Sequence, residues 1–405
     1  MIAYHFPPLS GSSGIQRTLR FVQQLPSHGW EPLVLTAHPR AYVQTSDDLL
    51  AEVPAGLVVR RAFALDSARH LALFGRYAAF TARPDRWVSW RYDGVRQGVR
   101  MVREFAPAMI WSTYPFATAH LIGAEVARRS GLPWIADFRD PMAQPGYPAD
   151  PVIHRQFLAI EATAAAQARA CTFTTPGAVR TYRERYPRSA DRMLLLENGF
   201  DEGSFAQAAL RAERAGRKGG PLIVLHSGIL YPQERDPTHL FSALRRLHAT
   251  GRLTPAQVRL RFRASAHDDH IRRLAAEQGV GEFVELAPSL PYLDALAEML
   301  SVDALLIMQD AGCNDQIPAK AYEYLRAGRP ILAITDPAGD TADLVRRAGI
   351  DAIAKLESAD AIESTLMNFV RQLAEGRAGV PAVDVVTGMS REARSREFAA
   401  LLDCL

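Results

Sequence analysis

Residues 314–334 read NDQIPAKAYEYLRAGRPILAI and contain one complete helix-to-strand unit. Pro318 suits the start of a helix, Gly328 suits its end, and Pro330 prevents the helix from continuing. The apolar run at 331–334 has the length and composition of a buried strand. A strand that follows a helix in this way is typical of α/β proteins with parallel sheets.

The same alternation runs through both halves of the chain. Short apolar runs predict strands at 2–6, 31–36, 57–62, 109–113, 134–137 and 171–175, and again at 222–227, 258–264, 283–286, 304–308, 330–334 and 352–354. A helical pattern covers 18–25, the polar, glycine-rich segment 211–220 suits a linker, and 391–405 has helical spacing of apolar residues. We therefore expect two α/β halves followed by a terminal helix.

Composition excludes several classes of protein. The 405 residues include 47 Lys+Arg against 44 Asp+Glu, and 48% are hydrophobic, which excludes a disordered chain and a polybasic nucleic-acid tail. The length predicts two domains with a cleft between them. The start MIAYHFPP has no charged segment before an apolar run, so we expect a cytoplasmic protein. The three cysteines have no CxxC spacing, so we expect no disulfide and no metal site.

Lysine is scarce in this chain, which makes Lys320 notable. The three lysines are Lys218, Lys320 and Lys355. Lys320 and Glu323 lie three residues apart near the start of the expected helix, where a phosphate is favoured. A lysine adds a point charge for a diphosphate, and a carboxylate can accept two hydroxyl hydrogen bonds from a sugar. The alternative is an exposed ion pair between these two side chains.

Two segments of the first half are further candidates for a ligand site. The loop at 7–17, with Gly11 and Gly14, joins a strand to a helix and would let the backbone approach a ligand closely, although such a loop is often only a turn. The strand at 134–137 runs into Arg139 and Asp140, where open α/β sheets place ligands. The alternative there is an Asp–Arg pair that ties down the loop, with Asp140 as a cap.

A basic and aromatic segment lies between these two candidates. Residues 55–105 contain ten arginines and four acidic residues, a net +6, together with interleaved Phe, Tyr and Trp residues. Residues 60–103 could therefore meet an anionic membrane surface. The alternative is a solvated helical insertion whose aromatic residues pack into the domain.

Six motifs in order carry a resemblance that spans nearly the whole chain. They are Ala3-Tyr4-His5-Phe6-Pro7-Pro8 with Gly11, Gly14 and Arg17; Pro84-Asp85 with Trp90; Ala136-Asp137-Phe138-Arg139-Asp140-Pro141; Glu197-Asn198-Gly199-Phe200-Asp201; His226-Ser227-Gly228-Ile229-Leu230-Tyr231; and Ile317-Pro318-Ala319-Lys320 into Glu323-Tyr324-Leu325. The sequence resembles bacterial retaining glycosyltransferases of family 4 (GT4-like), of the polysaccharide-biosynthesis type.

The resemblance implies an α/β protein of GT-B fold, with two Rossmann-like domains facing a cleft. Residues 1–200 would form the acceptor-binding domain and residues 201–385 the nucleotide-sugar-binding domain. Residues 386–405 would form a helix that packs back toward the first domain. The motif at 197–201 is similar to the point where this family crosses between domains.

The resemblance also implies roles for individual residues. The family's acidic pair falls on Asp315 and Glu323, its phosphate-binding base on Arg235 after Gly228, and its nucleotide-base loop on 287–291. Where many relatives have a histidine, this chain has Arg139. The implied catalytic residues are Glu323, Lys320, Arg139 and Asp140, and the implied donor-binding residues are Gly11, Gly14, Arg17, Gly228, Arg235, Leu290, Asp315, Ile317, Pro318, Lys320 and Glu323.

The implied reaction is metal-independent transfer of a sugar, with retention, from a UDP-sugar or GDP-sugar to a hydroxyl acceptor. The acceptor would be a lipid-linked or glycan intermediate of cell-surface polysaccharide, met at the inner membrane, with no further cofactor and no nucleic-acid partner. Two alternatives are a nucleotide-sugar-binding protein without transferase activity and a GT-B-fold epimerase. A reductase is disfavoured because the chain has no GxGxxG followed by a ribose-binding acid.

Overall fold

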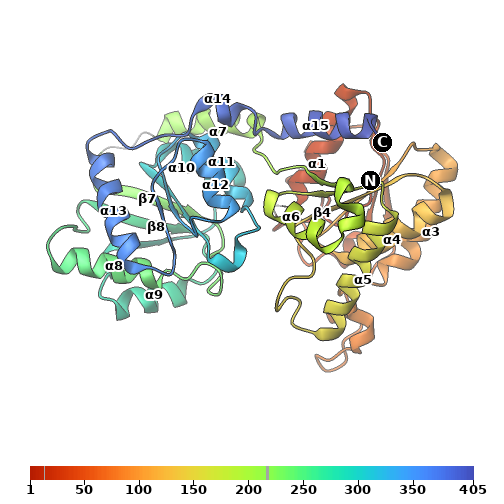
Figure 1. Ribbon diagram of the computed structural model, residues 1–405, viewed down its shortest axis with the longest axis horizontal. Helices are drawn as coiled ribbons and strands as arrows, with labels where there is room; N and C mark the ends of the chain where they lie inside the picture. Colours follow the sequence, from red (N-terminus) through yellow and green to blue (C-terminus); the bar gives the residue numbers. More distant parts are fainter. Residues whose placement is uncertain (13, 216–218) are drawn as a thin grey trace. The chain divides into compact units, whose positions relative to one another are not determined.

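The computed structural model describes residues 1–12, 14–215 and 219–405, and these form two compact units (Figure 1). The first unit consists of Met1–Glu197 and Glu392–Leu405, and the second of Asn198–Arg391. The first crossing therefore lies inside the motif at 197–201, where the resemblance places it. The return crossing lies at 391/392, later than the expected boundary at 385/386.

The N-terminal unit is built on parallel strands. They are β1 (Val34–Ala37), β2 (Val59–Ala62), β3 (Ile110–Thr113), β4 (Trp134–Arg139), β5 (Ala170–Phe173) and β6 (Met193–Leu195). Single parallel bridges from Ile2 to Leu35 and to Ser112 join β1 to β3. The order across the sheet is therefore β2-β1-Ile2-β3-β4-β5-β6, which is a doubly wound arrangement.

The expected first strand at 2–6 is reduced to the bridge at Ile2. The amide of Ile2 donates to Trp111 O, and that of Ala3 donates to Leu35 O. The chain then turns, because the amide of Phe6 donates back to Tyr4 O. The apolar run marks a buried segment correctly, but pairing ends where the turn begins. Strand β6, in contrast, has no counterpart among the predicted strands.

Helices cover both faces of the N-terminal sheet. They are α1 (Gly14–Gln24), α2 (Ser67–His70), α3 (Trp90–Phe105), α4 (Ala117–Ser130), α5 (Pro151–Gln167), α6 (Pro176–Arg185) and α15 (Arg391–Asp403), with short 3-10 turns at Leu25–His28, Pro39–Ala41, Leu50–Glu52, Ala79–Ala82 and Pro187–Arg192. Helices α3, α4, α5 and α6 contribute to one core, and α1 and α15 to another.

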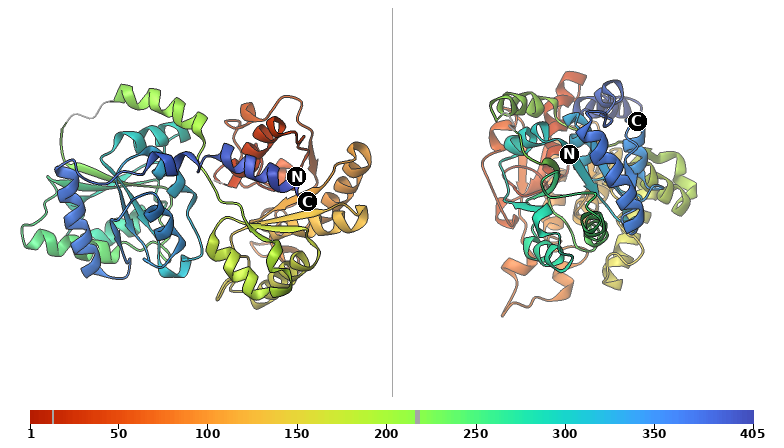
Figure 2. Two further views of the ribbon diagram at one scale, coloured as in Figure 1. Left: turned by 45° about the horizontal axis from the view of Figure 1, so that its top comes forward. Right: turned by 90° about the vertical axis from the view of Figure 1, so that its left-hand side faces the viewer.

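The terminal helix α15 packs beside α1, as Figure 2 shows. The rings of Phe21 and Phe398 lie 4.8 Å apart between centroids, and the hydroxyl of Ser395 donates to Gln24 Oε1 at 2.7 Å. Apolar contact and a polar anchor thus hold the last helix on the N-terminal unit. This is the position that the resemblance implies for the end of the chain.

The C-terminal unit repeats the arrangement with a six-stranded parallel sheet. Its strands are β7 (Leu222–Ser227), β8 (Val258–Arg263), β9 (Val284–Ala287), β10 (Ala304–Met308), β11 (Ile331–Ile334) and β12 (Ile353–Ala354), in the order β12-β11-β10-β7-β8-β9. Its helices are α7 (Glu202–Ala215), α8 (Thr238–Ala249), α9 (Asp268–Glu277), α10 (Tyr292–Ser301), α11 (Ala319–Ala327), α12 (Asp340–Arg347), α13 (Ala359–Ala374) and α14 (Val383–Thr387), with 3-10 turns at Gly281–Phe283 and Ala311–Cys313.

Alternate residues of each strand contribute to the cores on the two faces of this sheet. In β10, Leu306 and Met308 join the core that contains residues of α8, α9 and α13, whereas Leu305 and Ile307 join the core of α7, α10, α11 and α12. Because successive side chains of a strand point to opposite faces, a strand covered on both sides is apolar throughout. The apolar runs of the sequence predict these strands for that reason.

The strand order reverses between β7 and β10. In a doubly wound sheet, ligands bind at the carboxyl ends of the strands beside such a reversal. The segments that leave these ends are 228–237 after β7 and 309–318 after β10. In the N-terminal unit the corresponding reversal lies between Ile2 and β3, next to the segment that leads into α1.

The expected linker at 211–220 belongs to helix α7 over 211–215. This correction has a physical cause, because Ala208 is buried and Ala212 packs against the core that α7 shares with α10. The expected linker residues 216–218 lie outside the described residues, and so does Lys218.

Candidate functional site

Helix α11 begins at the reversal of the C-terminal sheet. Pro318 caps it with extended backbone, φ −62° and ψ 132°, and Gly328 ends it in the left-handed region at φ 65°. Both ends agree with the sequence prediction. Lys320 therefore lies in the first turn, where unpaired amides and the helix dipole favour an anion.

Lys320 is half-buried and contacts a histidine. Its Nζ lies 3.0 Å from Nε2 of His226, the residue before the end of β7. Burial and the positive charge of Arg235 lower the pKa of Lys320 well below its usual value, although Glu323 acts in the opposite direction. A cation in such surroundings gains much when an anion arrives beside it.

Glu323 follows one turn later and has a different partner. Its Oε1 accepts a hydrogen bond from the Tyr292 hydroxyl at 2.9 Å. Burial raises the pKa of Glu323, while Arg391, Tyr292 and Lys320 act to lower it. Lys320 and Glu323 each have a partner on another element, so the geometry does not match the alternative of an exposed ion pair between them.

Gly228 and Arg235 lie in the segment that follows β7. Gly228 has φ 105°, and a Cβ built on it would lie 3.1 Å from Lys320 Nζ. The backbone therefore approaches the lysine head closely here, and glycine allows both the approach and the conformation. Arg235 donates from Nη1 to Ile229 O at 2.8 Å, and its guanidinium lies over the Tyr231 ring, 5.3 Å from the centroid.

The predicted residues just before α11 differ in exposure. Asp315 is half-buried in the turn before the helix, and the Ile317 side chain is 4% exposed and belongs to the core. Gln309 anchors this segment, because its Nε2 donates to Cys313 O at 2.9 Å and to Gln316 O at 3.0 Å. Ile317 can therefore face a ligand through its backbone, while its side chain anchors the segment.

Leu290 lies in the expected base loop, between β9 and α10, and is 37% exposed. Arg263 holds this loop from the end of β8, because its Nη1 donates to Pro288 O at 2.7 Å. The backbone O of Arg263 accepts the amide of Gly228 at 2.8 Å. One residue thus links the segment after β7 to the segment after β9.

In the N-terminal unit, Gly14 lies where a side chain cannot fit. A Cβ on Gly14 would lie 2.3 Å from His5 Nδ1 and 2.7 Å from Arg139 Nη1. The Ser12 hydroxyl accepts the Gly14 amide at 3.2 Å and lies 3.3 Å from His5 Nδ1. Burial and Arg139 lower the pKa of His5 to about 3, so this imidazole is neutral near pH 7. Gly11, at φ 77°, is exposed beside Gln44, and Ser13 lies outside the described residues.

Arg139 is the last residue of β4, and Asp140 follows it at the carboxyl edge of the sheet. Arg139 has φ 63°, a region that non-glycine residues rarely adopt, at a register shift between β4 and β5. Its Nη1 donates to Tyr114 O at 3.4 Å, and the Thr174 hydroxyl donates to Asp140 Oδ1 at 3.4 Å. Burial raises the pKa of Asp140, although Arg139 and Thr174 act to lower it. The structure thus brings Gly14, Arg139 and His5 together at this edge.

Arg17 is buried in the N-terminal unit. The residue is 6% exposed, and its guanidinium donates to both carboxylate oxygens of Asp137 and to the backbone O of Leu196 and of Glu197. These bonds tie α1 to β4 and to the end of the unit. Arg17 therefore has a structural function, and its place among the donor-binding residues stays a prediction.

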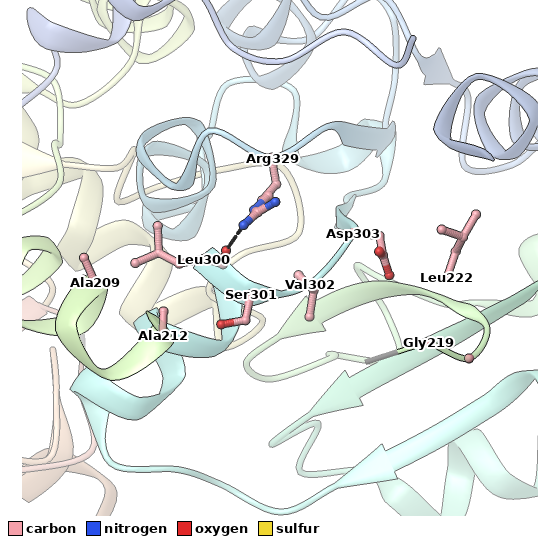
Figure 3. Close-up of a pocket in the computed structure, with 10 residues that line it drawn as sticks. Ala209, Ala212, Gly219, Leu222, Leu300, Ser301, Val302, Asp303 and Arg329 are labelled. Carbon is pink, nitrogen blue, oxygen red and sulfur yellow. Dashed lines mark hydrogen bonds between the residues drawn. The ribbon is translucent and has the colours of Figure 1, made fainter. Parts of the chain in front are cut away.

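Figure 3 shows a hollow of the C-terminal unit that is separate from these residues. It is lined by Leu222, which begins β7, by Asp303, just before β10, and by Arg329, just before β11. Arg329 donates from Nε to Leu300 O at 2.8 Å. These positions are at the amino ends of the strands, whereas Lys320, Gly228 and Arg235 follow carboxyl ends.

Within residues 1–12, 14–215 and 219–405, His, Cys, Asp and Glu side chains nowhere gather in threes as a set that could hold a metal ion. None of the helices in these ranges combines the length and the hydrophobicity that crossing a bilayer requires.

Three residues of these sites were not predicted individually from the sequence: His226, His5 and Tyr292. His226 and His5 stand in two of the six motifs, so their neighbourhood was marked although their contacts were not. Tyr292 has no signal in the sequence, because its contact with Glu323 is tertiary and joins the successive helices α10 and α11.

Comparisons with known proteins agree with the fold. The family model of the glycosyl transferase 4-like domain matches residues 13–199. The structure is similar to sucrose-phosphate synthase from Thermosynechococcus elongatus, with a TM-score of 0.70 and 15% identity over 99% of this chain and 98% of that one. It is also similar to HepE from Anabaena in complex with UDP, with a TM-score of 0.68 and 14% identity over 100% and 99% of the two chains.

A third similar structure is WaaG, a glycosyltransferase involved in lipopolysaccharide biosynthesis, with a TM-score of 0.61 and 13% identity over 99% of this chain and 95% of that one. No curated protein matches the sequence at a significant level. The strand orders, the two units and these likenesses together show a protein of GT-B fold, and its residues 13–199 match the family model of the glycosyl transferase 4-like domain.

Proposed function

We propose that the protein is a retaining glycosyltransferase that moves a sugar from a UDP-sugar or GDP-sugar to a hydroxyl acceptor. The observation that carries the proposal is the convergence of Lys320, Arg235 and Gly228 at the reversal of the C-terminal sheet. Two cations, a closely approaching backbone and a helix start suit a diphosphate.

The diphosphate is the leaving group, so these cations act where negative charge develops. The bond from the anomeric carbon to the β-phosphate oxygen breaks, and a bond to the acceptor oxygen forms. The acceptor proton passes to the departing diphosphate. Lys320 and Arg235 stabilise the charge on that diphosphate electrostatically. This assignment makes no use of a metal or of an enzyme nucleophile.

Glu323 binds hydroxyl groups of the donor. Its Oε1 already accepts one hydrogen bond, from Tyr292, and a carboxylate has capacity for several more. Asp315, Pro318 and the backbone of Ile317 border the same helix start, and Leu290 borders the base. In the N-terminal unit, Arg139 and Asp140 are the polar groups that meet the sugar or the acceptor, beside the backbone of Gly11 and Gly14.

UDP is the first nucleotide to test. HepE, to which this chain is similar in fold, has been solved with UDP and with UDP-glucose. A thermal-shift screen over UDP, GDP and their sugars tests binding, because a ligand at 100 times its dissociation constant stabilises by about 2.7 kcal/mol. Failure of every nucleoside diphosphate to raise Tm contradicts the proposal.

Product analysis separates the proposed transferase from its two alternatives. A transferase releases the diphosphate in proportion to the glycoside formed and needs an acceptor for turnover. A GT-B-fold epimerase changes the donor sugar without an acceptor, and a binding protein leaves the donor intact. Glycoside with the anomeric configuration of the donor supports retention, and the opposite configuration contradicts it.

A lipid-linked glycan at an anionic membrane is the proposed acceptor. Trp87 and Trp90 are buried, in line with the packing alternative, but Leu73, Phe74 and Phe80 are 71%, 95% and 77% exposed. Arginines of α3 (91, 96, 100 and 103) line a groove with Tyr92. Exposed apolar side chains and an exposed ring among arginines, as at Tyr92, suit the interface of an anionic bilayer.

Co-sedimentation with vesicles tests this part of the proposal. We expect binding to anionic vesicles that weakens with salt, and weaker binding by Phe74→Ser/Phe80→Ser. Binding that is the same for neutral and anionic vesicles contradicts the electrostatic part. Binding that is unchanged in the double variant contradicts insertion of the two rings.

A further inference from the structure

His226 has a different partner on each ring nitrogen. Nδ1 lies 3.0 Å from the backbone O of Leu306 in β10, and Nε2 lies 3.0 Å from Lys320 Nζ. A carbonyl oxygen can only accept, so Nδ1 carries the proton in this contact. Nε2 of the neutral ring then has a lone pair that faces the lysine, and it accepts a hydrogen bond from it.

The surroundings keep this imidazole neutral. His226 is 1% exposed, and burial, Lys320 and Arg235 lower its pKa well below the usual value, while the contacts with Leu306 and Ile229 act to raise it. A second positive charge 3.0 Å from the lysine would be repelled strongly. Toward Lys320 the ring is therefore a fixed hydrogen-bond acceptor, through Nε2.

Several charged or titratable groups face the pair. Arg235 lies in the segment after β7, Glu323 is on the same helix as Lys320, and Tyr292 of α10 donates to Glu323. Arg391 acts on Glu323 electrostatically, and the Tyr324 hydroxyl accepts the amide of Ser227 at 2.7 Å. The lysine head itself is in contact with His226, at 3.0 Å between Nζ and Nε2.

We propose that His226 is a positioning residue for the donor diphosphate: its neutral imidazole holds the Lys320 head beside Gly228 and leaves the other N–H bonds of the ammonium for phosphate oxygens. The proposal rests on the proposed function. A lysine side chain has many rotamers, and ordering it only when the ligand binds would reduce the affinity. The contact with His226 orders the side chain beforehand. An ammonium has three donors, of which the ring takes one.

A consequence concerns pH. An acceptor bonded to the ammonium favours the charged form of the lysine. Burial and Arg235 lower the pKa of Lys320. Without the ring acceptor, less opposes this lowering, so the lysine loses its proton at lower pH. Diphosphate affinity falls as pH rises through the pKa of the lysine, and this fall should begin at lower pH when the acceptor is removed.

The test compares His226→Leu with His226→Gln in the full chain. UDP and GDP are titrated against the parent protein, and the nucleotide that binds more tightly is used for the variants. The matching nucleoside, uridine or guanosine, is the probe that lacks phosphate. We expect His226→Leu to weaken the diphosphate by about tenfold, on the scale of a hydrogen bond to a charged group, and to leave the nucleoside unchanged. The side-chain amide of His226→Gln offers an acceptor again and should restore part of the affinity.

A matched control is His248→Leu, because His248 also contacts a backbone O, that of Leu253, but lies at the end of α8 away from Lys320. Diphosphate and nucleoside affinities that fall together in His226→Leu, or a pH dependence identical to that of the parent, overturn the positioning function. If the parent binds neither UDP nor GDP, the proposed function itself fails, and the variants are not needed to see it.

Discussion

The Arg17 guanidinium and the Asp137 carboxylate form a buried bidentate pair, with Nη2 to Oδ1 at 2.9 Å and Nε to Oδ2 at 3.1 Å. The hydroxyls of Thr113 and Thr172 also donate to Asp137, each at 2.7 Å. Burial would raise the pKa of Asp137, but Arg17 and the two threonines lower it overall. The pair joins α1 to three neighbouring strands just below the carboxyl edge that holds Arg139 and Asp140.

Removal of one partner should be costly. Arg17→Met leaves a buried carboxylate without its cation, and we expect a loss of about 3–5 kcal/mol in unfolding free energy. Urea denaturation measures this loss. Arg17→Met/Asp137→Asn, which removes the charge but keeps an acceptor for a threonine, should recover part of the stability. A single variant within about 0.5 kcal/mol of the parent contradicts the structural function of the pair.

The same pair predicts a dependence on pH. The pKa of Asp137 is lower in the folded protein than in the unfolded chain, so the carboxylate contributes stability above the unfolded value of about 3.9. That contribution is lost as pH falls through the folded value. The stability difference between the parent and Asp137→Asn should therefore shrink on acidification below about pH 4. A difference that is constant or grows there contradicts the assignment.

The sequence predicted the helix-and-strand alternation well because these strands are covered on both faces. Strands β7 and β10 have the predicted bounds, since a parallel strand buried on both sides is apolar throughout. The prediction of a strand at 2–6 was wrong for a local reason, because backbone pairing stops after Ala3, where a turn forms between Tyr4 and Phe6. Hydrophobicity reports burial, and it does not report where backbone pairing stops.

The sequence predicts the residues of the candidate site that lie on one helix, but it does not predict the contacts of that helix with other elements. Lys320 and Glu323 share a helix, so their spacing showed a common face. Their partners, His226 and Tyr292, come from β7 and α10, and only the fold brings them together. For Arg17, the motif marked an important residue, but its contacts with Asp137 and the backbone of Leu196 are tertiary and cannot be derived from spacing.

Gly14→Ala tests the crowded start of α1. A Cβ would lie 2.3 Å from His5 Nδ1 and 2.7 Å from Arg139 Nη1, so both side chains must move. We expect a loss of about 1–3 kcal/mol in stability from overpacking, together with lower activity. Gly203→Ala in α7 is the control, because its nearest contact is Asp201 Oδ1 at 3.6 Å. An equal effect of the two substitutions contradicts the close approach at Gly14.

Lys320→Ala and Glu323→Ala test the proposed donor site directly. Each removes a preorganised group, and we expect kcat/KM to fall on the order of 100-fold or more. Lys355→Ala is the matched control for the lysine, because Lys355 is exposed and lies after β12. The assay is glycosyl transfer with the donor that the thermal-shift screen selects. Near-parent rates in both variants contradict the site assignment.

Tyr292→Phe tests the charge state of Glu323 while the Glu323 side chain itself is kept. The Tyr292 hydroxyl donates to Glu323 Oε1 at 2.9 Å and lowers a pKa that burial raises. Its removal should therefore raise that pKa further, and the carboxylate that accepts donor hydroxyls should be lost at a higher pH. We expect the acid limb of the kcat/KM profile to move upward in pH, while the rate well above this limb stays near that of the parent. A matching profile for Tyr292→Phe and the parent would mean that the Glu323 carboxylate does not titrate in donor recognition, whereas a uniform loss at every pH would mean that the tyrosine contacts the donor itself.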